Sequence, residues 1–234
     1  ICIRICGLFL LPALLSCAQA PTATPKLPSN VSIEADIAYD THPQTVLDII
    51  APTERTTEKR PGVIVIHGRG WVNGAKQSMV ERYVLPWVEK GFVAANIEYR
   101  LAGVATAPAA VEDVLKAAEF FRKNAKRWNV DPDRIVVTGN SAGGHLSLMV
   151  GLTPKSAKLG PTAKVAAVVN FYGITDVEDQ LGGENMRKYA VTWVPEGEGR
   201  MDLARRVSPM NYIRKDVPAI LALHGTADEI VPFA

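Results

Sequence analysis

The chain has 234 residues, of which 47% are hydrophobic and 21% are charged. This composition excludes a disordered chain, collagen-like repeats and a coiled coil, and the length suits one domain with a substantial core. The 26 basic and 24 acidic residues leave a net charge of +2, so no basic excess indicates nucleic acid as a partner. All three cysteines, Cys2, Cys6 and Cys17, lie near the N-terminus. The rest of the chain therefore has no disulfide framework and no cysteine metal site.

The first 20 residues have the features of an export signal. Arg4 precedes a short apolar run, and residues 18–20 (AQA) have the small side chains of a cleavage site. Residues 14–17 (LLSC) also resemble a bacterial lipobox, in which Cys17 becomes a lipid anchor and the contact with a membrane. We expect a secreted or periplasmic protein, with lipidation as the alternative to cleavage, and a proline-rich linker over residues 21–30.

From residue 31 onward, strands alternate with helices. Residues 31–37 alternate apolar and polar side chains, which predicts a half-exposed strand, and residues 45–50 predict a second strand. Continuous apolar runs, each typical of a strand buried on both faces of a parallel sheet, follow over residues 62–66, 92–97, 134–138, 165–171 and 218–223. We expect one α/β domain over residues 31–234, with a mostly parallel sheet flanked by helices and the first two strands as an antiparallel edge.

The clearest helix pattern starts at Pro108. Apolar residues recur every three or four positions from Val111 to Trp128, which predicts one buried helix face. Acidic residues lie early in this segment and basic residues lie late, which complements the helix dipole. The segment connects two predicted parallel strands, as a crossover helix does.

Residues 139–143 (GNSAG) lie between a predicted strand and a predicted helix. This is the context in which G-x-S-x-G forms a nucleophile elbow. The two glycines leave room for neighbouring backbone, the strained turn exposes the Ser141 hydroxyl, and the N–H of Ala142 can stabilise an oxyanion. We predict Ser141 as a nucleophile. The alternative is a glycine-rich turn without function.

Two further loops follow predicted strands. Residues 67–71 (HGRGW) can turn backbone N–H groups towards the same pocket, with His67 holding the loop by hydrogen bonds. Trp71 adjoins this loop and is a candidate to line the substrate pocket. Residues 224–228 (HGTAD) place Asp228 where the acid of a catalytic triad belongs, in the order Ser, Asp, His. The alternative for Asp228 is a turn residue.

Together these motifs resemble α/β-hydrolase serine esterases of the hormone-sensitive-lipase type, closest to the small bacterial acetyl-esterase branch that includes acetylxylan and feruloyl esterases. The resemblance runs from about Leu47 to Phe233. The segments that carry it are HGRGW, EYRL at 98–101, PAAVEDV at 108–114, GNSAGGH at 139–145 and HGTADEIVP at 224–232.

The resemblance implies Ser141 as nucleophile and Asp228 as acid, with the backbone N–H groups of Arg69, Gly70 and Ala142 as the oxyanion hole. It implies no cofactor and no metal. The expected substrate is a small-molecule or carbohydrate ester with a short acyl group, such as acetyl or feruloyl groups on plant polysaccharide. Arg69 departs from the family's usual HGGGW and adds a cation, which could bind an acidic or polyhydroxylated substrate.

The general base of such an enzyme is a histidine, and no histidine follows Asp228. His42, His67, His145 and His224 are each weak candidates, so we expect a fragment whose catalytic histidine, final strand and last helix lie beyond residue 234.

Two other interpretations of the function stay open. One is an exopeptidase of the prolyl-oligopeptidase group, although the elbow lacks that group's Ser-Tyr-Gly-Gly. The other is a non-catalytic α/β-hydrolase that binds a ligand or partner.

Overall fold

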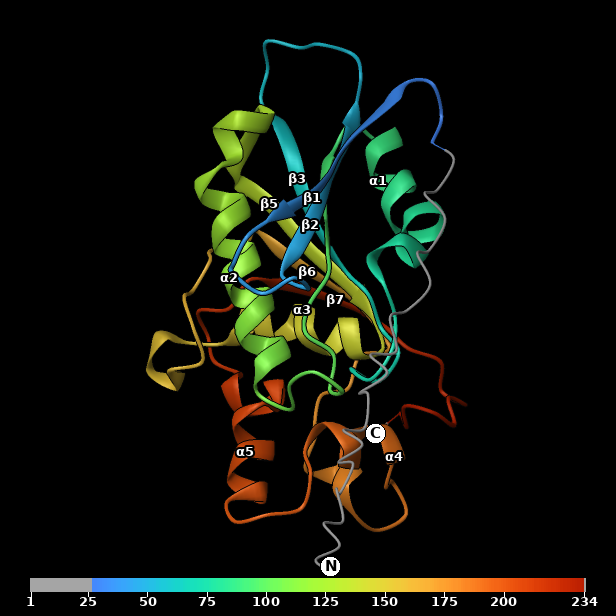
Figure 1. Ribbon diagram of the computed structural model, residues 1–234, viewed down its shortest axis with the longest axis vertical. Helices are drawn as coiled ribbons and strands as arrows, with labels where there is room; N and C mark the ends of the chain where they lie inside the picture. Colours follow the sequence, from blue (N-terminus) through green and yellow to red (C-terminus); the bar gives the residue numbers. More distant parts are fainter. Residues whose placement is uncertain (1–26, 234) are drawn as a thin grey trace, which may run out of the picture.

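The computed structural model describes residues 27–233. Its centre is a seven-stranded sheet in the order β1-β2-β4-β3-β5-β6-β7 (Figure 1). The strands are β1 (Val31–Ala38), β2 (Val46–Pro52), β3 (Arg60–Ile66), β4 (Val93–Ile97), β5 (Val130–Asn140), β6 (Ala167–Phe171) and β7 (Ala219–Leu223). Strand β2 is antiparallel to β1 and to β4, and all other pairs are parallel. The mostly parallel sheet with an antiparallel edge is therefore confirmed.

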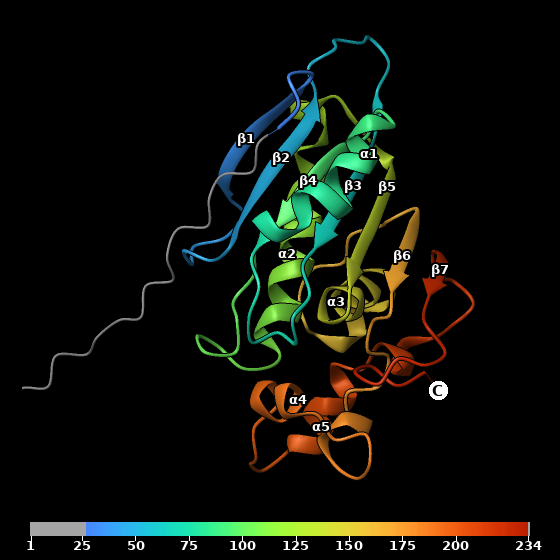
Figure 2. The same ribbon diagram turned by 90° about the vertical axis from the view of Figure 1, so that its right-hand side faces the viewer.

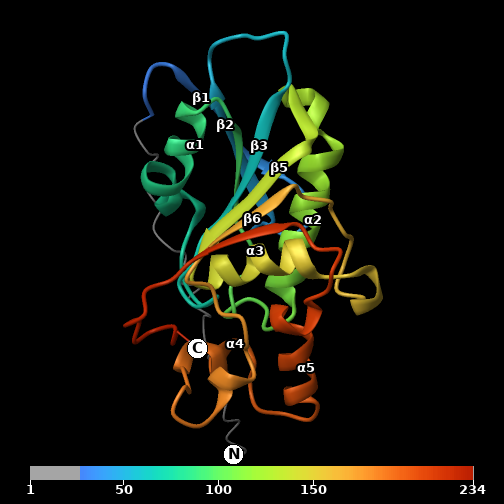
Figure 3. The same cartoon turned by 180° about the vertical axis from the view of Figure 1, so that it is seen from behind.

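Helices cover both faces of this sheet (Figures 1 and 3). One face carries η1 (Lys76–Met79), the π-helical turn η2 (Val80–Val84) and α1 (Leu85–Glu89), and the other carries α2 (Ala109–Lys123) and α3 (Ala142–Leu152). The alternation of side chains along β3 explains both layers. Val63 and Val65 pack in the cluster that includes Val80 and Val84, whereas Ile64 and Ile66 pack in the cluster of α2 and α3.

The remaining helical segments are short. They are η3 (Ala125–Trp128), η4 (Lys155–Ala157), η5 (Asp179–Leu181), α4 (Lys188–Trp193), α5 (Arg200–Arg206) and η6 (Pro209–Tyr212). The helix expected from Pro108 to Trp128 ends at Lys123, because Asn124 leaves the helical conformation before η3 begins. Figure 2 shows α4 and α5 beyond the carboxyl ends of the parallel strands. Both belong to the insertion between β6 and β7.

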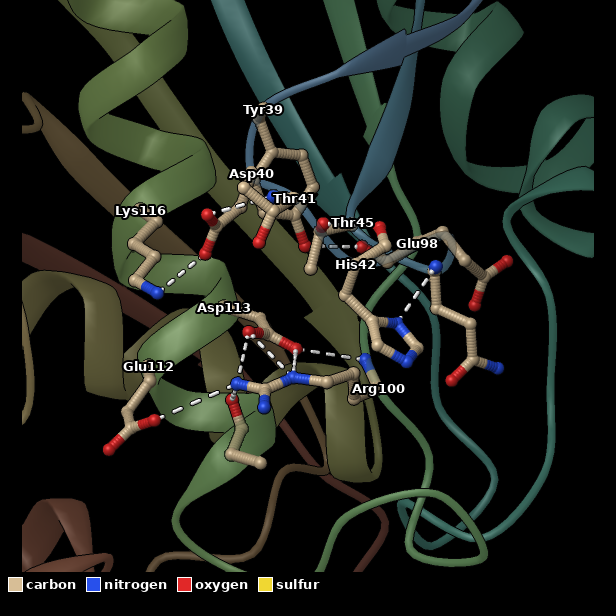
Figure 4. Close-up of polar contacts among 12 residues, drawn as sticks. Tyr39, Asp40, Thr41, His42, Thr45, Glu98, Arg100, Glu112, Asp113 and Lys116 are labelled. Carbon is tan, nitrogen blue, oxygen red and sulfur yellow. Dashed lines mark hydrogen bonds and ion pairs between the residues drawn. The ribbon is translucent and has the colours of Figure 1, made fainter.

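A buried ion pair joins the end of β4 to α2 (Figure 4). The Arg100 guanidinium donates to both carboxylate oxygens of Asp113, at 2.7 and 2.8 Å, and the Arg100 backbone N–H donates to Asp113 at 3.0 Å. Asp113 is fully buried. Beside this pair, Lys116 contacts Asp40, and the Tyr39 hydroxyl donates to the backbone oxygen of Glu98 at 2.7 Å. The EYRL and PAAVEDV segments are thus joined to each other and fix where β4 ends.

The apolar run over residues 218–223 predicted a strand buried on both faces, and this prediction is wrong. Every residue of β7 is exposed, with Leu221 58% and Leu223 44% accessible. Strand β7 pairs only with β6, and within residues 27–233 no helix covers it. The apolar pattern identified the strand, whereas burial depends on what packs against it.

Several expectations fall on residues that the structure does not describe. The export signal, the lipobox cysteine Cys17 and most of the linker precede residue 27. Residues 27–30 lead directly into β1. Among the described residues, no helix has both the length and the hydropathy needed to cross a membrane.

Candidate active site

The predicted elbow forms a sharp turn between β5 and α3. Ser141 has φ 52° and ψ −122°, and its backbone N–H donates to the Phe171 oxygen at 2.9 Å. A Cβ atom on Gly143 would lie 2.1 Å from the Ile66 oxygen, and one on Gly139 would lie 2.4 Å from the Gly143 oxygen. Only glycine fits at these two positions, which is why the motif needs both. The strained backbone leaves the Ser141 side chain partly exposed at the carboxyl edge of the sheet.

The loop after β3 turns beside this elbow. Arg69, Gly70 and Trp71 all have positive φ angles, of 76°, 63° and 59°. A Cβ atom on Gly70 would lie 2.6 Å from Cβ of Tyr189, so this position combines left-handed backbone with close approach of α4. Strands β3 and β5 are neighbours, so the loop amides and the Ala142 N–H lie at the same edge. The Arg69 side chain is exposed and forms no ion pair within residues 27–233.

Glu98 holds both ends of this loop, a role that the sequence did not reveal. Its carboxylate accepts a hydrogen bond from His67 Nε2 at 2.7 Å and one from the Lys76 backbone N–H at 3.0 Å. Tyr99 stacks on the His67 ring and donates its hydroxyl to the His67 oxygen at 3.0 Å. His67 is buried in this network, so the expected structural role of His67 is confirmed.

The expectation that Trp71 lines a substrate pocket is wrong. Its side chain is fully buried and stacks on Trp193, with ring centroids 4.1 Å apart. Its indole N–H donates to His145 Nδ1 at 3.2 Å. Trp193 comes from α4 of the β6–β7 insertion, which packs over the loop and covers the indole. Trp71 therefore packs in the interior, where it holds the loop against Trp193, and its side chain does not contact solvent.

His145 is the buried partner of Trp71. Its Nε2 donates to the Val207 oxygen at 2.6 Å while its Nδ1 accepts from Trp71, so the folded protein needs the neutral imidazole. Burial lowers the pKa of His145 from 6.5 to about 4. This excludes His145 as a surface-accessible base and confirms it as a packing residue.

The shifted pKa of His145 predicts acid sensitivity. The unfolded chain binds a proton near pH 6.5 and the folded chain only near pH 4, so the contribution of His145 to stability is complete above pH 6.5 and falls between these values. The total loss is about 3 kcal/mol, since each pKa unit corresponds to about 1.4 kcal/mol. Urea unfolding at several pH values would measure it. His145→Gln keeps a donor and an acceptor without titrating, and an equal pH dependence in this variant would contradict the assignment.

Asp228 lies in the loop after β7. Its Oδ1 accepts the backbone N–H groups of Ile230 and Val231, each at 2.9 Å. The hydrogen bond from Val231, together with that from Ile230, lowers the pKa of Asp228 below its usual value. The carboxylate therefore stays charged at neutral pH. His224 Nε2 lies 3.7 Å from Asp228 Oδ2 but is hydrogen-bonded to the Val231 oxygen at 2.8 Å.

The β6–β7 insertion also holds the loop of Asp228. Arg187 donates to the backbone oxygens of Glu229 and Ile230, at 3.0 and 2.9 Å, and the Tyr189 hydroxyl reaches the Ile230 oxygen at 3.3 Å. Tyr189 is the same residue that packs against Gly70. One short helix, α4, thus touches both the candidate oxyanion loop and the loop of the candidate acid.

The strand order places the candidate groups in a row along one edge (Figure 2). The oxyanion loop follows β3, Ser141 follows β5 and Asp228 follows β7. Strand β6 separates β5 from β7, so the last two groups start about 10 Å apart, which is two strand spacings and leaves room for an imidazole. The Ser141 hydroxyl forms no hydrogen bond with the side chain of any of the four histidines, all of which lie in the described part of the chain. Within that part, no cluster of His, Cys, Asp and Glu could hold a metal ion.

Known sequences that are similar to this chain include named esterases. A family model described as BD-FAE matches residues 47–234. Esterase LipC of Mycobacterium tuberculosis is 29% identical over 206 residues, covering 84% of this chain and 51% of LipC. The probable carboxylic ester hydrolase LipM of the same organism is 30% identical over 210 residues, covering 85% of this chain and 49% of LipM. The chain spans about half the length of the curated relatives it matches.

Solved structures that are similar to this chain also include esterases. A truncated form of a carbohydrate esterase from gut microbiota superimposes with a TM-score of 0.75 and 28% identity, covering 86% of this chain and 79% of that one. Esterase B from Lactobacillus rhamnosis superimposes with a TM-score of 0.70 at 20% identity, over 84% of this chain and 66% of that one, which supports the fold alone. These likenesses confirm the fold class expected from the sequence.

Proposed function

Because the chain belongs to the BD-FAE family, we propose that it forms the catalytic core of a serine carboxylic-ester hydrolase. The observation that carries this proposal is the strained elbow of Ser141 beside a loop with three consecutive positive φ angles. Non-glycine residues rarely adopt such backbone, and strain of this kind clusters where a reactive group must be held in place. A purely structural turn would not need to expose the serine hydroxyl.

The chemistry we propose proceeds in two steps through Ser141. The serine oxygen attacks the ester carbonyl as a histidine takes its proton, and the carbonyl oxygen becomes an oxyanion held by the N–H groups of Arg69, Gly70 and Ala142. The tetrahedral intermediate collapses as the alcohol leaves with that proton. Water, deprotonated by the same histidine, then attacks the acyl-enzyme and releases the acid and free Ser141. Asp228 orients the histidine, which in the family's chain order follows the acid.

The proposed substrates are short acyl esters of carbohydrates. The likeness to a carbohydrate esterase at 28% identity supports the class of substrate. The covering insertion supports the short acyl group, because Tyr189 of α4 packs against Gly70 of the oxyanion loop and reaches the loop of Asp228, which limits the space at the candidate site. Residues 31–52 form β1 and β2 at one end of the sheet and add no cover. Residues 1–20 support export of the protein, which fractionation of producing cells would test.

The expected result with model substrates is a preference for short chains. In the complete gene product, p-nitrophenyl acetate and butyrate should be cleaved with a higher kcat/KM than long-chain p-nitrophenyl esters. The reason is that stacked Trp71 and Trp193 fill the space beneath the oxyanion loop, where a long acyl chain would need a channel. Steady-state kinetics over a chain-length series would measure the preference. Faster turnover of the long-chain esters would contradict it.

A further inference from the structure

Two tyrosine hydroxyls meet beside the elbow. The oxygens of Tyr83 and Tyr172 lie 3.0 Å apart, and Asn140 Nδ2 lies 3.4 Å from the Tyr172 oxygen. Tyr83 comes from the π-helical turn η2, and Tyr172 directly follows β6. Both side chains are half-buried, so they are accessible from solvent. We call these two side chains the hydroxyl pair.

The hydroxyl pair lies next to the candidate catalytic groups. Asn140 immediately precedes Ser141, and the Ser141 N–H donates to Phe171, the residue before Tyr172. A Cβ atom on Gly68 would lie 3.2 Å from both Nδ2 and Oδ1 of Asn140. The amide of Asn140 therefore lies between the oxyanion loop and the hydroxyl pair. In the strand order, Tyr172 follows β6, between the strands that lead to the nucleophile and the acid.

Both tyrosines are presented by unusual backbone. Tyr172 has φ 41°, in the left-handed region that a bulky residue rarely occupies. Tyr83 lies in a π-helical turn, a rare conformation that is frequent at functional sites. The Tyr83 ring also packs edge-on against Phe171, with centroids 5.6 Å apart. Two distortions in separate segments of the chain thus accompany the contact between the same two oxygens.

The hydroxyl pair has a hydrogen bond left to give. Two phenols carry two O–H hydrogens, and the contact between them uses one. Asn140 Nδ2 donates its own hydrogen to the Tyr172 oxygen, so this contact uses neither phenol hydrogen. Asn140 Oδ1 is buried without a partner. Burial, with the hydrogen bond between Tyr83 and Tyr172, raises the pKa of Tyr83 to about 12, so this phenol stays neutral and protonated at physiological pH. The pair therefore offers a neutral donor.

We propose that Tyr83 and Tyr172 form a binding site for an oxygen of the alcohol half of the substrate, a sugar hydroxyl or ring oxygen. This inference rests on the proposed function. An acetyl group has only its carbonyl oxygen beyond the scissile one, and that oxygen goes to the oxyanion hole. The acceptor for the hydroxyl pair therefore comes from the alcohol half, and a simple alkyl or aryl alcohol has no further hydroxyl or ring oxygen to supply it. The pair selects polyhydroxylated alcohols.

The test compares two acetyl esters in the complete gene product. One is an acetylated xylo-oligosaccharide, and the other is p-nitrophenyl acetate, whose leaving group lacks sugar oxygens. In Tyr83→Phe and Tyr172→Phe, the ratio of kcat/KM for the sugar ester to that for the aryl ester should fall about three- to tenfold, the usual effect of one neutral hydrogen bond. The loss should appear mainly in KM. In the double variant the loss should be less than the product of the single losses, because the two hydroxyls act as a unit.

Tyr212→Phe is the matched control. It removes a hydroxyl that donates to the Arg206 oxygen in another part of the molecule, and the ratio should stay at the wild-type value. An unchanged ratio in both Tyr83→Phe and Tyr172→Phe would overturn the proposal, as would an equal loss on both esters. A wild-type protein that cleaves p-nitrophenyl acetate but not the sugar ester would overturn the hydroxyl-pair proposal alone. A wild-type protein that cleaves neither ester would overturn the proposed function as well.

Discussion

Replacing Ser141 with alanine in the complete gene product should lower kcat for p-nitrophenyl acetate by a factor of about 10⁶, as in other serine hydrolases. The substitution removes the only atom that can form the acyl-enzyme, while the oxyanion N–H groups remain. The residual rate should still exceed the uncatalysed one by about 10³–10⁴, because the oxyanion hole and substrate binding persist. Steady-state and single-turnover kinetics would measure both quantities.

The fold should survive this substitution. The Ser141 hydroxyl has no hydrogen-bond partner within residues 27–233, and alanine occupies the same strained backbone at similar cost. The melting temperature should therefore change little. Ser156→Ala, at an exposed position of η4, is the matched control and should keep full activity. A Ser141→Ala variant that retains a tenth of the wild-type rate would show that another group is the nucleophile.

Asp228→Asn should lower kcat by about 10⁴, the effect of the corresponding change in a serine protease triad. The substitution suits the test because the side-chain oxygen that accepts the N–H groups of Ile230 and Val231 can be kept. The loop geometry then survives while the charge is lost. Without that charge, the histidine is held in the wrong tautomer and its protonated form is not stabilised.

Kinetics across pH would separate the two readings of Asp228. If Asp228 is the triad acid, the Asp228→Asn variant should have a lower kcat at every pH value at which the wild-type enzyme is active. Asp202→Asn, an exposed carboxylate paired with Arg205 on α5, is the control and should behave as wild type. A loss of less than tenfold in Asp228→Asn, with normal folding, would show that Asp228 is a turn residue and that another carboxylate orients the base.

The local part of the architecture could be predicted because it depends on neighbours in the chain. Apolar runs such as residues 62–66 identify strands, since a strand exposes alternate faces and both are buried between helices. The glycines of the elbow were predictable for the same reason. Their requirement comes from backbone atoms within a few residues of Ser141 and from the neighbouring strand, which the motif itself implies.

Trp71 and β7 show where this reasoning fails. A tryptophan beside a catalytic loop and an apolar strand look the same in sequence whether or not something covers them. In the folded protein, Trp193 from 122 residues further along the chain stacks on Trp71 and buries it. Strand β7 has an apolar sequence and an exposed surface, because within residues 27–233 only β6 lies against it.

The sequence by itself determined the strand and helix order, the fold class and the positions of Ser141 and the glycine-rich loop, because each depends on a short pattern and on rules for parallel sheets. Only the tertiary structure decided that Glu98 closes the oxyanion loop, that α4 joins this loop to that of Asp228, and that Tyr83 meets Tyr172. Tyr83 and Tyr172 are 89 residues apart in the chain. Contacts over such separations depend on how helices pack across the sheet, and no local pattern encodes that packing.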